Sequence, residues 1–143
     1  MKRHIPILST LLVVALFFGA ESCSKKQPPD TLFSKMLGQW KKTAYATDDN
    51  GNGIIDAGEI HPQPANILDE LVFKSDTSGY ENTIVNKIQE VPLNFKWYVY
   101  AESLAVAYSA HDTIVYYIDN VNSYTLALYT NTSTGLAAYY YSK

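Results

Sequence analysis

Apolar and polar residues alternate with a period of two in eight separate segments from residue 39 onward. Each segment is six to nine residues long and rich in Tyr, Val, Ile, Thr or Phe, which favour strands. Successive side chains of a strand point to opposite faces, so this period predicts strands with one buried face. The segments cover residues 39–47, 70–75, 79–86, 93–100, 103–109, 113–120, 123–130 and 136–142.

The connections between these segments are short, and several carry turn residues. The segments 109–112 and 120–123 are examples, with the sequences SAHD and NVNS. Short connections join antiparallel neighbours, and eight such strands close a small up-and-down barrel. The sequence therefore predicts an all-β domain with an eight-stranded antiparallel barrel. An open sandwich of two sheets is the competing arrangement.

The alternation also predicts which side chains face the barrel interior. We expect the inward set to be Leu93, Phe95, Trp97, Val99, Leu104, Val106, Ile114, Ile118, Leu126 and Leu128. These side chains are mostly large, so they leave at most a small pocket, open at one end. For a small apolar ligand in that pocket, the candidate contacts are Phe95, Trp97, Val106, Tyr108 and Leu126.

The chain begins with a segment typical of a secretory signal peptide. Lys2 and Arg3 precede an apolar stretch over residues 5–18, and small residues lead to Cys23. The apolar stretch is too short to span a bilayer comfortably. We therefore expect residues 1–22 to be a signal peptide. Cys23 is the single cysteine, so it has no disulfide partner within the chain.

A lone cysteine at the cleavage point resembles the bacterial lipoprotein signal, in which this cysteine receives lipid. Ordinary secretion with a free thiol at the new terminus is the alternative. We expect Cys23 to be the lipid attachment, residues 23–30 to be a tether, and residues 31–143 to fold. The expected location is the bacterial cell envelope, on the periplasmic or the surface-exposed face of the outer membrane.

The charge of the chain argues against nucleic acid as a partner. Without residues 1–22, which carry Lys2, Arg3 and Glu21, the 11 basic and 14 acidic residues become 9 and 13, a net charge of −4. No basic cluster follows the tether, and a basic patch is what phosphate backbones require.

A short helix is predicted directly before the first strand. We expect Asp30 or Thr31 to cap it, the helix to run through Met36 or Leu37, and Gly38 to end it. The sequence MLGQW, a short helix running into Gly-x-Trp, resembles the opening motif of the lipocalin superfamily. With LVFKSD, FKWYV, LAVAY and YTLALY, residues 31–143 are similar to the compact lipocalin-like lipoproteins of Bacteroidetes-type bacteria.

That resemblance implies an eight-stranded barrel, and full-size lipocalins bind apolar small molecules inside it. It also implies that Trp40 closes the barrel floor and is structural rather than ligand-binding. This chain is shorter than full-size lipocalins and lacks both their disulfides and their long C-terminal helix.

Residues 48–59, DDNGNGIIDAGE, interrupt the strand pattern with the spacing of a calcium-binding EF-hand loop. Calcium takes six or more oxygens, which such a loop supplies from alternate positions. Gly53 stands at the sharp turn, and Ile55 at the apolar eighth position. The expected oxygen donors are Asp48, Asn50, Asn52, Asp56 and Glu59 through side chains and Ile54 through its carbonyl.

A solvated polar turn is the competing interpretation, because Asn, Gly and Asp dominate turns. A paired, sensor-type EF-hand is excluded, because Pro62 and Pro64 prevent a regular helix after the loop. The expected calcium affinity is therefore modest, with a dissociation constant of roughly 10⁻⁴ to 10⁻³ M, as in extracellular modules.

The sequence predicts no enzyme. His61 and His111 lack zinc-site spacing, and neither a Gly-x-Ser-x-Gly motif nor a phosphate-binding glycine loop is present. Two functions remain. The first is a lipid-anchored barrel that binds a small apolar ligand. The second is a protein-binding accessory module with a plugged barrel, acting through the tyrosine-rich outer face, since ten of the twelve tyrosines follow residue 97.

Overall fold

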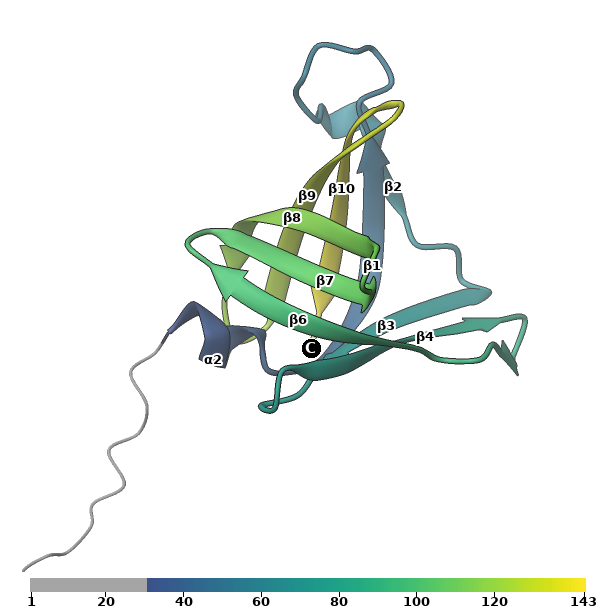
Figure 1. The fold of residues 1–143 in the computed structure, drawn as a ribbon. Coiled ribbons are helices and arrows are strands. Elements are labelled where there is room, and N and C mark those ends of the chain that lie inside the picture. Colours follow the sequence, from purple (N-terminus) through teal and green to yellow (C-terminus); the bar gives the residue numbers. More distant parts are fainter. Residues whose placement is uncertain (1–30) are drawn as a thin grey trace, which may run out of the picture.

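The computed structural model describes residues 31–143, which form a β-barrel with one short helix, α2 (Leu32–Met36), at one end (Figure 1). A 3₁₀ turn, η2 (Ala57–Glu59), follows the loop after the first strand. The strands of this part of the chain are β1 (Gly38–Thr47), β2 (Ile60–Pro62), β3 (Ile67–Phe73), β4 (Ser78–Val85), β5 (Ile88–Gln89), β6 (Leu93–Tyr100), β7 (Ser103–Ser109), β8 (Asp112–Val121), β9 (Thr125–Thr132) and β10 (Gly135–Ser142).

Eight of these strands close the barrel. Their order is β10, β9, β8, β7, β6, β4, β3, β1, every pair is antiparallel, and β10 pairs with β1 from Lys41 opposite Ser142 to Thr47 opposite Ala137. The predicted all-β antiparallel barrel is confirmed, and the open sandwich is wrong. The two short strands β2 and β5 pair with β1 and β4 as additions to the barrel. The sequence did not predict them because three and two residues are too few for a period to show.

The helix α2 lies at one end of the barrel, near the C-terminus, as Figure 1 shows. Thr31 caps it by accepting a hydrogen bond from the Ser34 backbone, as predicted. The indole Nε1 of Trp40 donates to the Met36 carbonyl at 2.7 Å, and Phe33 stacks on Trp97 with 4.7 Å between ring centroids. Trp40 is completely buried, which agrees with a structural role at this end.

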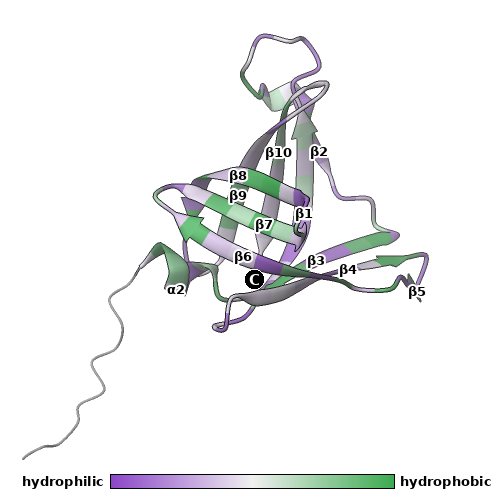
Figure 2. Ribbon diagram, in the orientation of Figure 1, coloured by the Kyte–Doolittle hydropathy of each residue, from purple (hydrophilic) through white to green (hydrophobic). Residues whose placement is uncertain are grey.

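The core lies inside the barrel. Figure 2 shows the apolar residues as green segments that alternate with paler or purple ones along the strands. Nine of the ten residues predicted to face inward are buried or half-buried. The exception is Leu93, which is 57% exposed. It is the first residue of β6 and pairs with Glu81 at the edge of the β4–β6 ladder, so the barrel wall ends there.

Gly79 on β4 allows three strands to approach closely. A Cβ atom added to it would lie 2.2 Å from Cε2 of Phe95 and 2.4 Å from the carbonyl oxygen of Val72. Real Cβ atoms do not approach other atoms so closely, and the Val72 carbonyl belongs to the neighbouring strand. The Phe95 ring therefore occupies the space that any larger residue at position 79 would need.

The predicted signal peptide, Cys23 and the tether lie outside the described residues. Within residues 31–143, no helix has the length and apolar character needed to cross a membrane.

Candidate functional site

The barrel interior changes character along its axis. Near α2, it is filled by fully buried side chains, among them Trp40, Trp97 and Leu104. Toward the opposite end, the inward side chains of Tyr108, Tyr116 and Tyr139 are only half-buried. Tyrosine has an apolar ring and a polar hydroxyl, so a half-buried tyrosine can contact a ligand with either part. The core is therefore less completely sealed at these three tyrosines than near α2, and we call this part of the interior the tyrosine mouth.

A carboxylate faces the tyrosine mouth from β4. The hydroxyl of Tyr108 donates to Oε2 of Glu81 at 2.7 Å, and the Tyr108 ring packs edge-on against Phe95. Burial, and next the hydrogen bond to Glu81, raise the pKa of Tyr108 well above its usual value. Burial likewise raises the pKa of Tyr116, with contributions from Tyr139 and Glu81. These hydroxyls are therefore neutral hydrogen-bond donors at physiological pH.

A second carboxylate at the same end is neutralised by a lysine. Nζ of Lys42 lies 2.8 Å from Oδ2 of Asp69 and 5.4 Å from the ring centroid of Tyr139. Gln63 also donates to Asp69, at 2.9 Å. Burial opposes ionisation of Asp69, but the hydrogen bond and charge of Lys42, with Thr83 and Gln63, lower its pKa. The interior thus holds an ammonium group between a carboxylate and an aromatic ring.

The five residues predicted to contact a ligand all face the interior, but they differ in accessibility. Phe95, Trp97, Val106 and Leu126 are buried in the core, and Tyr108 alone is half-buried. The sequence reasoning missed Glu81, Tyr116 and Tyr139. Strand alternation could have placed two of them in the interior, because Tyr116 shares a face with Ile118 and Tyr139 shares one with Tyr141. However, these residues belong to strands that meet only in the closed barrel.

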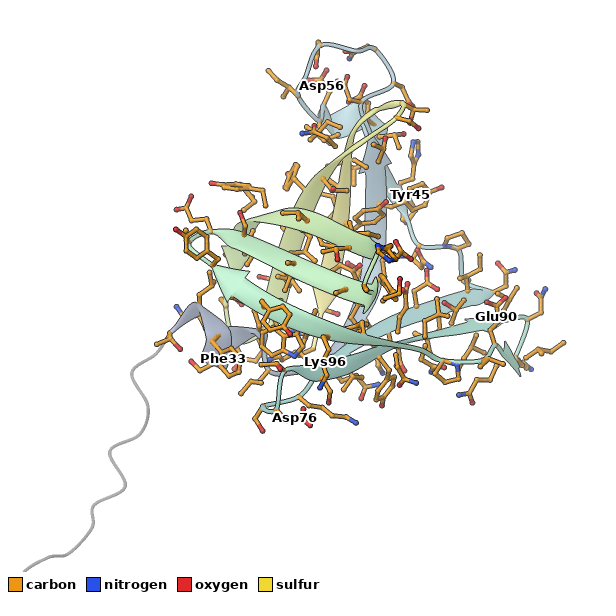
Figure 3. All side chains as sticks on the ribbon, viewed as in Figure 1. Phe33, Tyr45, Asp56, Asp76, Glu90 and Lys96 are labelled. Carbon is orange, nitrogen blue, oxygen red and sulfur yellow. The ribbon has the colours of Figure 1, made fainter. Side chains whose placement is uncertain are left out.

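Open grooves lie on other surfaces of the domain. One of about 600 Å³ crosses β4, β6 and β7 and is lined in part by Lys74, Lys96 and Tyr98. Lys96, which Figure 3 labels, and Tyr98 belong to the outer face, because they alternate with the buried Phe95 and Trp97. Phe95 and Tyr108 also line this groove, so it extends to one residue of the tyrosine mouth. A groove of about 490 Å³ runs over β8 and β9 and includes Tyr117 and Tyr129. A third, of about 680 Å³, lies at the open end of the β3–β4 hairpin, where β3 begins and β4 ends.

The predicted calcium loop extends beyond the barrel from the end of β1. Figure 3 labels Asp56 within it, at the opposite end of the molecule from Phe33. The Asp48 backbone donates to the Leu136 carbonyl at 2.9 Å, which ties the start of the loop to β10. Gly53 has a φ of 80°, a left-handed conformation that glycine adopts at little cost, as expected for the sharp turn.

The side chains of the loop form one hydrogen-bond network directed inward. Asp48 accepts from the backbones of Asn52 and Gly53 at 3.0 and 2.7 Å. Glu59 accepts from the backbones of Asp49, Asn50 and Asp56 at 3.0, 3.3 and 2.9 Å. Asp48 and Glu59 are buried although they belong to a surface loop. The two ends of the predicted site are therefore fixed by backbone amides.

The centre of the loop is held by amide groups. Nδ2 of Asn50 and Nδ2 of Asn52 donate to Oδ2 of Asp56 at 3.0 and 3.1 Å. Asp56 thus accepts hydrogen bonds from two neutral amide groups at the centre of the loop. Residues 31–143 contain no group of three or more His, Cys, Asp or Glu that could hold a metal. The donor set of the loop is nevertheless oxygen-only, with three carboxylates and two amides, which is the chemistry that calcium prefers.

The outer face is rich in tyrosine, as the sequence indicated. Tyr98, Tyr100, Tyr117 and Tyr124 are each at least half exposed, on β6, on β8 and before β9. Tyr129 and Tyr140 instead pair across β9 and β10, with 3.1 Å between their hydroxyl oxygens. The exposed rings are therefore distributed over several strands.

Comparisons with known proteins agree with this architecture. No protein-family model and no curated protein sequence matches the chain. The structure is similar to the crystal structure of a lipocalin-like protein from Bacteroides uniformis, with a TM-score of 0.55 and 9% sequence identity. The similarity covers 76% of this chain and 98% of that one. At so low an identity the likeness shows the fold alone, and the fold of this protein is a lipocalin-like barrel.

Proposed function

We propose that this protein is a non-enzymatic, lipid-anchored protein of the cell envelope that binds a small, largely apolar ligand at the tyrosine mouth. The observation that carries the proposal is the gradient of burial inside the barrel. The side chains near α2 are sealed, whereas Tyr108, Tyr116 and Tyr139 at the opposite end are half-buried and face inward. A lipocalin-like barrel of eight strands can hold one small ligand in such a place.

The mouth also has the composition of a small-molecule site. Such sites are mostly apolar and aromatic, with a few polar groups that orient the ligand. Here the aromatic rings of Phe95, Tyr116 and Tyr139 supply the apolar surface, while Glu81 and the Lys42–Asp69 pair supply polar groups.

The test is titration of the purified protein with an environment-sensitive apolar dye. Wild-type protein is expected to bind the dye, and Tyr116→Ala, which removes a half-buried ring from the mouth, is expected to weaken binding about tenfold. Tyr98→Ala is the matched control, because Tyr98 lies on the outer face of β6 and is 56% exposed. Absence of dye binding by wild-type protein would favour the accessory module acting through its outer tyrosines.

Calcium binding by residues 48–59 is part of the same proposal. It is supported by the EF-hand spacing, by the positive φ of Gly53, and by the inward direction of the Asp48, Asp56 and Glu59 carboxylates. Calcium would be held by the side chains of Asp48, Asn50, Asn52, Asp56 and Glu59 and by the Ile54 carbonyl. Bound there, calcium would interact with the Asp56 carboxylate in place of the neutral amide groups of Asn50 and Asn52 that now donate to it.

Two variants of the same loop test the calcium proposal. Asp56→Asn removes a carboxylate from a ligand position, and Asp49→Asn removes one from a position that supplies no ligand. Both residues are exposed, so the two changes have the same charge effect. At a calcium concentration tenfold above the dissociation constant, wild-type protein gains about 1.4 kcal/mol of unfolding free energy. Melting curves should show this gain in Asp49→Asn and not in Asp56→Asn, and equal curves with calcium and chelator would exclude the site.

A further inference from the structure

Two carboxylates enter the tyrosine mouth, and each lies beside tyrosine rings. On one side, Asp69 faces Lys42, whose ammonium also lies over the Tyr139 ring. On the other, Glu81 accepts from Tyr108, and its charge acts on Tyr116 and Tyr141. The two arrangements share a carboxylate and aromatic rings, and they differ in one component. The first contains an ammonium group, and the second does not.

The charge of Glu81 is not neutralised by the described part of the chain. No lysine or histidine of residues 31–143 forms an ion pair with it. One of its oxygens, Oε2, is bonded to the Tyr108 hydroxyl, while Oε1 receives no hydrogen bond from these residues. Since no buried polar side-chain atom in this region lacks a partner, Oε1 is open to solvent. Oε1 is therefore available to accept a hydrogen bond or to pair with a cation from solvent.

The surroundings of Glu81 suit a positive charge. The charges of Asp69 and Lys42 cancel each other. Glu81 therefore gives the mouth a net negative charge. The faces of tyrosine rings are also electrostatically negative and attract ammonium groups. Tyr116 and Tyr139 stand at right angles with 6.2 Å between their centroids, and Phe95 and Tyr108 stand likewise at 5.7 Å. The mouth therefore contains two edge-to-face ring pairs, and the Tyr108 ring of one pair is the ring whose hydroxyl donates to Glu81.

We propose that the ligand of the tyrosine mouth is an amphiphilic organic cation, whose ammonium head pairs with Glu81 and whose apolar part contacts the tyrosine rings. The Lys42–Asp69–Tyr139 contact shows this recognition within the protein itself, because it holds an ammonium between a carboxylate and a ring. This inference rests on the proposed ligand-binding function and assigns the chemical class of the ligand.

The experiment compares three probes that share an octyl chain and differ in the charge of the head group. Octyltrimethylammonium is cationic, octyl glucoside neutral and octanoate anionic, and each is titrated by calorimetry below its micelle concentration. The variant is Glu81→Gln, which keeps the shape and an acceptor for Tyr108 but removes the charge. The matched control is Glu102→Gln, because Glu102 also accepts from a tyrosine hydroxyl, that of Tyr117 at 3.1 Å, but on the exposed surface.

We expect wild-type protein to bind the cation at least about tenfold more tightly than octanoate. Glu81→Gln should weaken cation binding about tenfold and leave octyl glucoside binding unchanged, and Glu102→Gln should change neither. The cation proposal is overturned if the three probes bind equally, or if Glu81→Gln behaves as Glu102→Gln does. In that case ligand binding itself still stands, whereas failure of all three probes to bind removes both proposals. Melting curves check that Glu81→Gln is folded. If it is not folded, the cation proposal is decided by whether the wild-type protein binds octyltrimethylammonium more tightly than octanoate.

Discussion

Glu59 is expected to stabilise the loop even without calcium, and this can be measured separately from metal binding. Its carboxylate accepts three backbone hydrogen bonds, from Asp49, Asn50 and Asp56, and the side chain is 8% exposed. Glu59→Ala leaves all three donors without this acceptor. A buried donor that loses its partner costs roughly 1–3 kcal/mol.

The lower part of that range applies here. Asp49, Asn50 and Asp56 are exposed residues, so water can replace part of the lost interaction. About 1 kcal/mol for each of the three donors gives a total loss of about 3 kcal/mol of unfolding free energy. For a domain of this size, that corresponds to a fall in melting temperature of about 8–15 °C. Glu59→Gln keeps one acceptor oxygen and should lose only about 1 kcal/mol.

The assay is denaturant unfolding and thermal melting in the presence of a chelator. Glu90→Ala is the control, because Glu90 is a solvent-exposed glutamate between β5 and β6 whose side chain accepts no hydrogen bond within the described residues. Its effect should remain within about 0.5 kcal/mol. If Glu59→Ala unfolds at the same denaturant concentration as Glu90→Ala, the carboxylate network does not hold the loop and the reasoning is wrong.

Three further predictions concern the barrel and the anchor. Gly79→Ala should lower the unfolding free energy, measured by denaturant unfolding, by at least about 3 kcal/mol, because the added Cβ would meet Phe95 and the Val72 backbone. Gly58→Ala is the control and should change little, because the space around Gly58 is open. Burial raises the pKa of Tyr108, Tyr116 and Tyr141 in the folded protein, so the stability contributed by these neutral side chains is complete below about pH 10 and is lost as the pH rises further. Ultraviolet titration should show them remaining neutral after the exposed tyrosines ionise, and a single transition near the usual tyrosine value would contradict this. Cys23→Ala should move the protein from the membrane fraction to the soluble fraction, and a variant that stays with the membrane would refute lipid anchoring.

Local sequence pattern was enough to predict the eight strands of the barrel and, for β6 to β9, the face that each strand buries. The period of two in segments such as 93–100 and 103–109 is a local property, since adjacent residues of any strand point to opposite sides. The short connections between the later strands then favoured antiparallel neighbours and a barrel. The helix cap at Thr31 and the turn at Gly53 could also be predicted from the sequence, because each depends on only a few neighbouring residues.

The tertiary structure alone decided which polar side chains meet inside the barrel. Glu81 and Tyr108 are 27 residues apart, as are Lys42 and Asp69. The first contact exists only because β6 pairs with both β4 and β7, and the second only because β1 pairs with β3. No local pattern specifies these long-range pairings, because register depends on the packing of all strands together. The exposure of Leu93 has the same origin: alternation assigned it correctly to the inner face, but only the closed barrel shows that the wall ends there.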